Sequence, residues 1–161
     1  MSRALIIGYG NPLRGDDRLG WQVADRVSQA VEDFGELGRA DKSTKVMAVH
    51  QLTPELAEPI SEAELVIFVD ASLDGQPGSW RCDPVTRDTI TSTAFAHYCT
   101  PVTLLYYAET IFKARPRSLL ISVAADSFDC GDQLTANVET VLPEIVRFIG
   151  QQIFRLPQNP E

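Results

Sequence analysis

The apolar residues of this chain fall into two patterns, and their order along the sequence predicts the fold. Short segments rich in apolar residues, typical of strands, occur at residues 4–8, 44–50, 65–71 and 118–125, and the continuous run at 65–71 is typical of a central strand buried on both faces. A fifth, peripheral strand is expected at 79–85. Between the first two runs, apolar residues recur at spacings of three and four, which predicts an amphipathic helix over 19–34 with a buried stripe of Leu19, Val23, Val27, Ala30, Val31 and Phe34.

Three further helices are predicted from their start signals. Thr-Pro pairs at 53–54 and 100–101 combine a favoured N-cap with a first-turn proline, which predicts helices over 53–61 and 100–112. Thr135 begins a final helix, in which Pro143 removes a backbone hydrogen bond and favours a kink. The last residues, 157–161, are expected to be a frayed tail.

The resulting order, βαβαβ(β)αβα, predicts an α/β protein. We expect a three-layer α/β/α sandwich around a mostly parallel, twisted sheet of about five strands. Residues 1–161 contain no repeat, low-complexity tract or linker, so they are expected to form a single domain. The carboxyl ends of parallel strands share one edge of a sheet, and ligands bind at that edge.

Composition and charge narrow the partners of such a domain. Of the 161 residues, 44% are apolar and 22% are charged, and the net charge of −8 argues against nucleic acids and anionic membranes. No apolar run is long enough to span a bilayer, and the first residues lack a cleavage site for a signal peptide. We therefore expect a cytoplasmic, monomeric protein. Its three cysteines are predicted to be free and to act as small core residues: Cys82, Cys99 and Cys130.

The stretch that follows the first predicted strand, GYGNPLRGDDRLGW at 8–21, has two possible interpretations. Its glycines suggest a phosphate-binding loop, but Leu13 stands where a dinucleotide turn needs its third glycine. Gly15 is followed by two aspartates, not by the Lys and Ser/Thr of a Walker loop. Nucleotide binding is therefore disfavoured. The glycines are instead expected to let the backbone turn sharply and approach a substrate chain closely.

Polar residues that follow the strands point to a cation site. Asp17 (or Asp16), Asp70 and His97 would supply the mixed oxygen and nitrogen ligands that suit nickel or zinc. Each has a simpler explanation: an aspartate that ends a strand often only forms a turn, and a lone histidine is often packed or solvated. Asp16 has the further alternative of capping the helix that starts near Arg18.

These residues also carry a resemblance to a known family. The motif G-x-G-N-P-L-R-G-D-D-x-x-G at 8–20 resembles that of the [NiFe]-hydrogenase maturation endopeptidases. So do the strand ending V-D-A at 69–71, a histidine eight residues before Leu105, and the loop from 126 to 135. The resemblance covers essentially the whole chain. It implies an α/β/α sandwich and a hydrolase that removes the C-terminal extension of a hydrogenase large-subunit precursor after nickel insertion.

The resemblance also implies the residues of the site. Nickel that arrives with the precursor would be contacted by Asp17, Asp70 and His97. These residues would recognise the metal and are also the candidates for catalysis. Some relatives have Glu at the position of Asp17. Arg14, Asp16 and His50 are the candidates for contact with the substrate. For Arg14 the alternative of a solvated side chain is slightly favoured, and His50 has no histidine counterpart in other relatives. The alternative function is a nickel-sensing chaperone or binding module, which would hold the same precursor through the same residues without cutting it.

Overall fold

The structure is a computed structural model that describes residues 3–35, 43–86 and 99–157. His97 lies outside these ranges, and so does the predicted tail, apart from Pro157.

One five-stranded sheet in the order β2-β1-β3-β5-β4 runs through the described residues. Its parallel strands are β1 (Ala4–Tyr9), β2 (Thr44–Val49), β3 (Leu65–Ser72) and β5 (Arg117–Ala124). The edge strand β4 (Trp80–Pro84) pairs antiparallel with β5. The mostly parallel sheet is confirmed, and β4 is the peripheral strand that was expected at 79–85.

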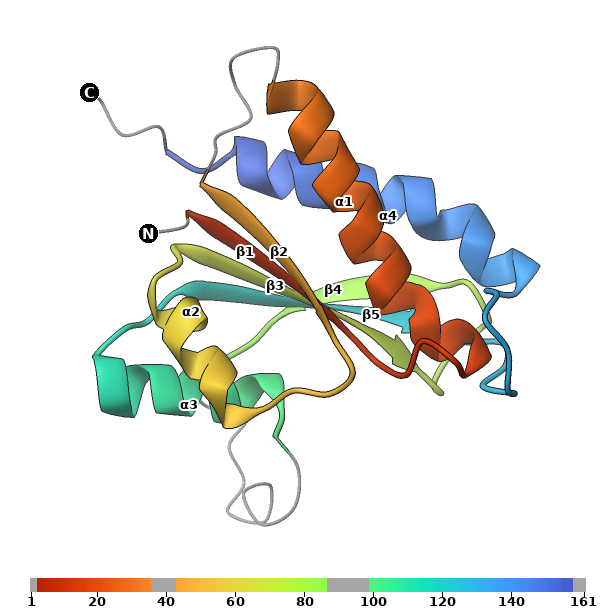
Figure 1. The fold of residues 1–161 in the computed structure, drawn as a ribbon, viewed down its shortest axis with the longest axis horizontal. Coiled ribbons are helices and arrows are strands. Elements are labelled where there is room, and N and C mark those ends of the chain that lie inside the picture. The colour runs from red at the N-terminus through yellow and green to blue at the C-terminus, as the bar shows by residue number, and fades with distance from the viewer. Residues whose placement is uncertain (1–2, 36–42, 87–98, 158–161) are drawn as a thin grey trace.

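Helices cover both faces of the sheet and complete the predicted three layers (Figure 1). On one face lie α1 (Leu19–Gly35) and α4 (Ala136–Phe154). On the other lie α2 (Ala57–Ser61) and α3 (Pro101–Phe112). Short 3-10 turns precede two of them: η1 (Gly15–Arg18) leads into α1, and η2 (Pro54–Leu56) leads into α2.

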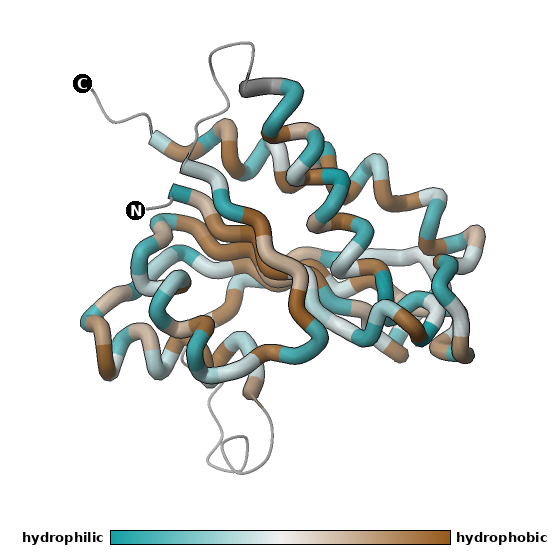
Figure 2. The backbone as a smooth tube through the Cα atoms, viewed as in Figure 1, coloured by the Kyte–Doolittle hydropathy of each residue, from teal (hydrophilic) through white to brown (hydrophobic). Residues whose placement is uncertain are grey.

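Two apolar cores lie on opposite faces of the central strands, which appear as a continuous apolar layer in Figure 2. Alternate residues of each strand point to opposite faces. Ile6 and Ile67 belong to the core under α1 and α4, whereas Ile7 and Phe68 belong to the core under α2 and α3. All four side chains are fully buried, and burial of each contributes roughly 1.5–3 kcal/mol to folding.

The helix starts follow the predicted signals, with one difference in how they are capped. Thr100 and Thr103 form a reciprocal capping box at the start of α3, with bonds of 3.2 and 3.3 Å. Thr135 is the N-cap of α4, but its side chain makes no capping bond. The helix does not end at Pro143, which lies inside it.

The glycines of the 8–21 stretch serve packing within the chain. A Cβ atom on Gly8 would lie 1.9 Å from the carbonyl oxygen of Gly20, so the end of β1 and the first turn of α1 are in direct backbone contact. Gly10 adopts φ +144°, and a Cβ there would lie 2.2 Å from the carbonyl oxygen of Asp17. The glycines therefore allow close approaches within the protein's own backbone, and the expected approach to a substrate chain stays a prediction.

The three cysteines are free, as predicted, but only two of them pack against a core. Cys82 and Cys99 are half-buried beside the two apolar clusters, whereas Cys130 is exposed in the loop between β5 and α4. The prediction of a core position was therefore wrong for Cys130. The described helices include none with the length and apolar character of a membrane span.

Candidate functional site

Two partly buried aspartates lie at the edge of the sheet where the parallel strands end. Asp70 is near the end of β3, and Asp17 lies in η1, which follows the loop after β1. Their charges interact, because the Asp17 carboxylate raises the pKa of Asp70. The structure therefore brings together two of the three predicted metal-contacting residues, from positions 53 residues apart in the sequence.

The carboxyl group of Asp70 is harder to ionise than an ordinary aspartate. Burial is the main cause of a rise of its pKa to about 6, and the charge of Asp17 adds to the rise. Hydrogen bonds from the Tyr9 hydroxyl and from the backbone of Ala71 act in the opposite direction, because they favour the carboxylate. Asp70 thus changes its charge close to neutral pH, whereas an exposed aspartate does so near pH 4.

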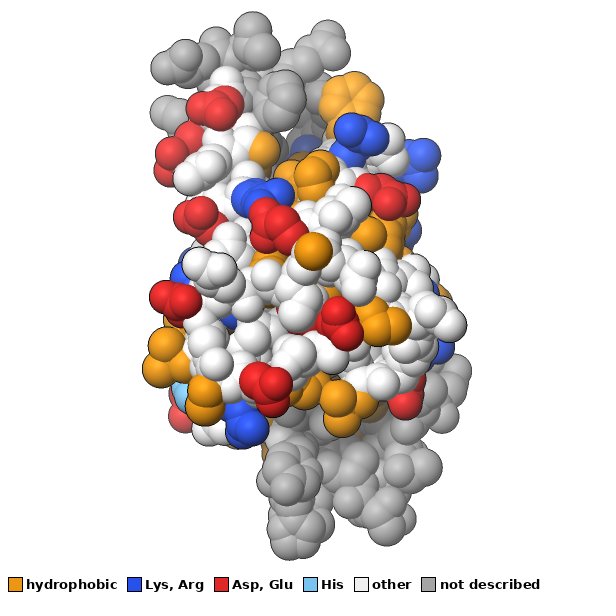
Figure 3. All heavy atoms as spheres, turned by 90° about the vertical axis from the view of Figure 1, so that its right-hand side faces the viewer, with side chains coloured by type: hydrophobic (Ala, Val, Ile, Leu, Met, Phe, Trp, Pro, Cys, Tyr) orange, Lys and Arg blue, Asp and Glu red, His pale blue; other side chains and the backbone are white. Residues whose placement is uncertain are grey.

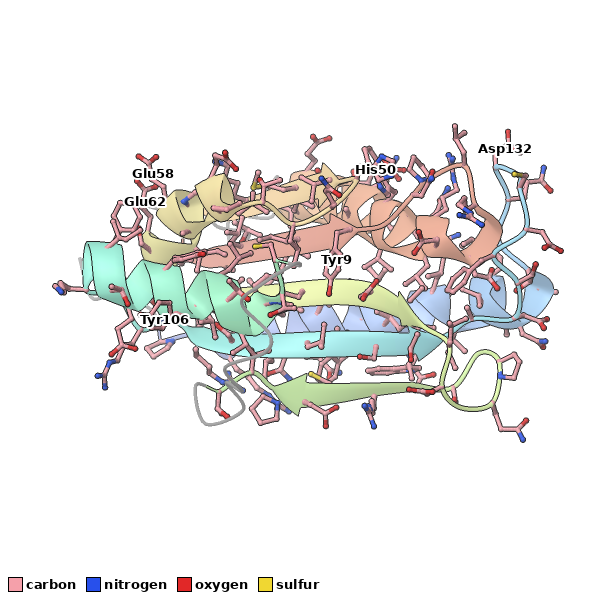
Figure 4. The ribbon with its side chains drawn as sticks, turned by 90° about the horizontal axis from the view of Figure 1, so that it is seen from below. Tyr9, His50, Glu58, Glu62, Tyr106 and Asp132 are labelled. Atoms are coloured by element: carbon pink, nitrogen blue, oxygen red, sulfur yellow. The ribbon has the colours of Figure 1, made fainter. Side chains whose placement is uncertain are left out.

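Tyr9 contacts Asp70, and the sequence did not point to it as a candidate for the site. Gly8 pairs with Val69 between β1 and β3, so Tyr9 and Asp70 are the next positions along the same ladder and point to the same face. Viewed from the side of α2 and α3, Tyr9 extends from β1 towards β3 (Figure 4). Burial, followed by the charge of Asp70, raises the pKa of Tyr9 far above its usual value, so the hydroxyl keeps its proton and donates to Asp70.

Asp17 is held by the loop that precedes it. Its Oδ2 atom accepts a hydrogen bond of 2.7 Å from the backbone N–H of Asn11, and its own N–H donates to the carbonyl of Arg14 at 3.0 Å. The glycine at position 10 allows this geometry, because a Cβ there would lie 2.9 Å from Asp17 Oδ1. The Oδ2 atom of Asp17 is thereby fixed, whereas its Oδ1 atom takes no part in the hydrogen bond to Asn11.

Asp16, the neighbouring candidate, has a different environment. Its side chain is completely buried and accepts four hydrogen bonds from Asp126, Ser127 and Thr135. Burial acts to raise its pKa, but these hydrogen bonds outweigh burial and hold the pKa below its usual value. The prediction that Asp16 caps the α1 region was wrong, because its bonds go to the β5–α4 loop instead. Contact with a substrate would require the carboxylate to leave these donors, so Asp17 is the better ligand of the two.

The other predicted site residues lie at the same edge or outside the described residues. Arg14 is exposed, and its backbone bridges to Gly131. His50 is exposed directly after β2, at the far side of β1 from Asp70 (Figure 4). Their contacts with a substrate stay predictions, and so does the role of His97, which lies outside the described residues. In the part of the chain that is described, no three His, Cys, Asp or Glu residues form a metal-binding group.

The surface around the two aspartates carries features that a protein substrate could contact. A depression over the ends of β3, β4 and β5 is lined by residues that include Ser72, Arg81 and Ser122, and Ser122 is the register partner of Asp70 on β5. Leu13 and Leu73, which follow β1 and β3, are 65% and 80% exposed. Figure 3 views this side of the molecule, where acidic, basic and apolar side chains lie among neutral polar surface. The edge therefore combines charged groups of both signs with apolar contact area.

The chain shares its fold with solved [NiFe] hydrogenase maturation proteases. HycI from Thermococcus kodakarensis KOD1 superimposes with a TM-score of 0.71 at 19% identity, over 93% of this chain and 91% of that chain. HybD from E. coli, a hydrogenase maturating endopeptidase, gives 0.72 at 18% identity, over 94% and 91%. The hydrogenase 2 maturation peptidase from Thaumarchaeota archaeon SCGC_AB-539-E09 gives 0.69 at 22% identity, over 94% and 98%.

The resemblance seen in the sequence motifs is thus confirmed at the level of the fold. No protein-family model matches the chain, and no curated protein matches its sequence. The matches to solved structures extend over nearly the whole of each chain, so the relationship covers the entire sandwich and is not limited to a shared βαβ unit.

Proposed function

We propose that this protein is an endopeptidase that removes the C-terminal extension from the large-subunit precursor of a [NiFe] hydrogenase after nickel insertion. The observation that carries the proposal is the Asp17–Asp70 pair, at the carboxyl edge of a sheet whose fold is that of solved maturation proteases. Both aspartates occupy the motif positions that carried the resemblance in the sequence.

Nickel is the cargo of the precursor in this proposal, and the donor set suits it. Carboxylate oxygen and imidazole nitrogen, from Asp17, Asp70 and His97, are accepted ligands of nickel, and the thiolates of the precursor would complete its coordination. Burial is the main cause of the raised pKa of Asp70, and a cation between the two aspartates would offset the smaller contribution from repulsion by Asp17. Nickel would supply Lewis acidity towards the scissile carbonyl or a bound water.

The residues of this chain would recognise and orient the loaded precursor. Asp17 presents a carboxylate fixed by Asn11, and Asp70 presents one fixed by Tyr9. Because both groups are held before the substrate arrives, little reorganisation is needed when the metal is engaged. A precursor without nickel would leave the two negative charges unneutralised, which gives the enzyme a physical means of rejecting unloaded substrate.

The decisive experiment compares nickel-loaded with nickel-free precursor. We expect mass spectrometry to show C-terminal shortening of the loaded form alone. Asp17→Asn, Asp70→Asn and His97→Ala should each slow cleavage at least tenfold, whereas Asp25→Asn, on an exposed position of α1, should not. Cleavage that ignores the metal, or full activity in all three site variants, would refute the proposal.

Retention without cutting would indicate the second class of function. If the loaded precursor forms a stable complex with the protein and keeps its full mass, the protein is the nickel-sensing chaperone or binding module described above. Cytoplasmic location and a monomeric state before engagement stay predictions, which fractionation and light scattering would check.

A further inference from the structure

The strongest unexplained feature of the described chain is the buried carboxylate next to the proposed metal ligand. Asp16 and Asp17 are consecutive residues of η1, yet their carboxylates contact different parts of the protein. Asp17 binds the N–H of Asn11 within its own loop. Asp16 binds donors that are 110 to 119 residues away in the sequence.

The contacts of Asp16 form a nearly complete set of acceptor bonds. Its Oδ2 atom accepts from the N–H of Asp126 at 2.8 Å, the N–H of Ser127 at 3.1 Å and the hydroxyl of Thr135 at 2.7 Å. Its Oδ1 atom accepts from the N–H of Thr135 at 2.8 Å. The side-chain hydroxyl of Thr135 is therefore used for Asp16 and not for capping its own helix. A buried anion is well placed there, because α4 begins at this point and helix N-termini favour negative charge.

The carboxylate strengthens a seam between the β1–α1 loop and the β5–α4 loop. Asp16 N–H donates to the Ser127 carbonyl at 2.9 Å, and Gly15 N–H donates to the Gly131 carbonyl at 3.1 Å. Gly131 N–H donates back to the carbonyl of Leu13 at 2.9 Å. The turn that carries Asp17 is thus attached on one side to a segment from the other end of the chain.

We propose that Asp16 is a positioning residue, whose buried carboxylate fixes the η1 turn against the β5–α4 loop and thereby holds Asp17 at the edge of the sheet where its charge acts on Asp70. The inference rests on the proposed function for its catalytic consequence, but not for its structural one. Asp16 itself does not touch substrate or metal in this arrangement. Its negative charge is taken up by N–H and O–H donors, so only the charge of its neighbour is presented to a cation.

Asp16→Asn tests the role of the carboxylate with almost no change in size. All four groups that bond to the Asp16 carboxylate, from three residues, are donors. The NH2 group of an asparagine is also a donor, so it would point at one or more of them and leave them without an acceptor. Hydrogen exchange at single amides reads the structural consequence. We expect at least tenfold faster exchange at Asp126, Ser127 and Thr135, and also at Asn11, whose N–H reports on Asp17. Asp25→Asn, at an exposed position of α1, the helix that follows η1, is the matched control.

Cleavage kinetics read the functional consequence. With the nickel-loaded precursor, Asp16→Asn is expected to lower kcat about tenfold or more, with KM changed less than threefold. If the variant were only less well folded, its rate would instead fall in proportion to the fraction of folded protein. Thr135→Val, which removes one of four donors, should give a smaller loss in the same direction, and Thr135→Ser should restore it. Thr135→Val also carries the test if Asp16→Asn does not fold.

The two proposals fail in different ways. If the wild-type protein does not cut the loaded precursor, the proposed function fails, while amide exchange still decides the positioning role. If Asn11 exchanges at its wild-type rate in the folded Asp16→Asn and Thr135→Val variants, or if kcat is unchanged in them, the positioning role of Asp16 is overturned.

Discussion

The hydroxyl of Tyr9 donates a hydrogen bond to the carboxylate of Asp70 across two neighbouring parallel strands. The bond lowers the pKa of Asp70, against the larger opposite effect of burial. Removing it by Tyr9→Phe should therefore raise the pKa of Asp70 above its present value of about 6. Carboxyl-resolved NMR titration measures this shift. Tyr107→Phe, on α3 beside the same core, is the control, and an unchanged or lower pKa in Tyr9→Phe would contradict the assignment.

A second prediction concerns the charge of Asp17. Its carboxylate raises the pKa of Asp70, so Asp17→Asn should lower the pKa of Asp70 below about 6. The same titration measures it, and the expected shift is opposite in sign to that of Tyr9→Phe. Asp74→Asn, after the end of β3, is a matched loss of one negative charge at the same edge. If Asp74→Asn lowers the pKa as much as Asp17→Asn does, the interaction is a general field and not a specific pair.

The third prediction links Asp70 to stability. The folded-state pKa, about 6, is above the ordinary aspartate value of 3.8, so ionisation of Asp70 costs folding free energy. The contribution of Asp70 to the free energy of unfolding of the wild-type protein is fully present below pH 4, and it is lost as the pH rises through 6. Asp70→Asn, which cannot ionise, should therefore be more stable than wild type at pH 8, by roughly 1–3 kcal/mol.

Urea unfolding at pH 4 and pH 8 measures that difference. The gain in the free energy of unfolding should appear at pH 8 and shrink towards zero at pH 4, while cleavage is lost at both. If Asp70→Asn is destabilised equally at the two pH values, the Asp70 side chain stabilises the fold, and its ionisation does not cost folding free energy as described.

Much of this fold was predictable because its elements are consistent with their local patterns. The unbroken apolar runs of β1 and β3 and the Thr-Pro start of α3 needed no tertiary information. Asp16 shows where that reasoning stops. A carboxylate just before a helix looks like a local cap, and nothing near it in the sequence reveals partners 110 or more residues away.

The site was predictable to the same extent. The sequence placed Asp17 and Asp70 at one edge, because polar residues that follow parallel strands meet there, and their contact with a metal stays a prediction. It could not identify Tyr9, because an aromatic residue at the end of a strand usually packs in a core, and its partner is set by the register of β1 on β3. The resemblance already favoured Asp17 over Asp16, but the physical reason, the burial of the Asp16 carboxylate by the tertiary structure, could not be read from the sequence.

The last prediction tests the backbone contact between β1 and α1. A Cβ added at Gly8 would lie 1.9 Å from the carbonyl oxygen of Gly20 and 2.5 Å from its carbonyl carbon, and both are backbone atoms that cannot rotate away. Gly8→Ala should therefore push α1 from the sheet, lower the free energy of unfolding by about 2–4 kcal/mol and displace the η1 turn with Asp17. Thermal unfolding and precursor cleavage measure the two effects.

Gly150→Ala is the matched control for this substitution. Gly150 lies on an exposed position of α4 with open space around its Cβ position, so alanine there should stabilise the helix by about 0.5–1 kcal/mol through its higher helix propensity. The two Gly→Ala changes are thus expected to change the free energy of unfolding in opposite directions. Gly8→Ala lowers it through a clash near the site, and Gly150→Ala raises it because alanine reduces the backbone entropy of the unfolded chain. If Gly8→Ala is as stable and active as wild type, the end of β1 is not packed against α1 as described, and Asp17 is not held by this contact.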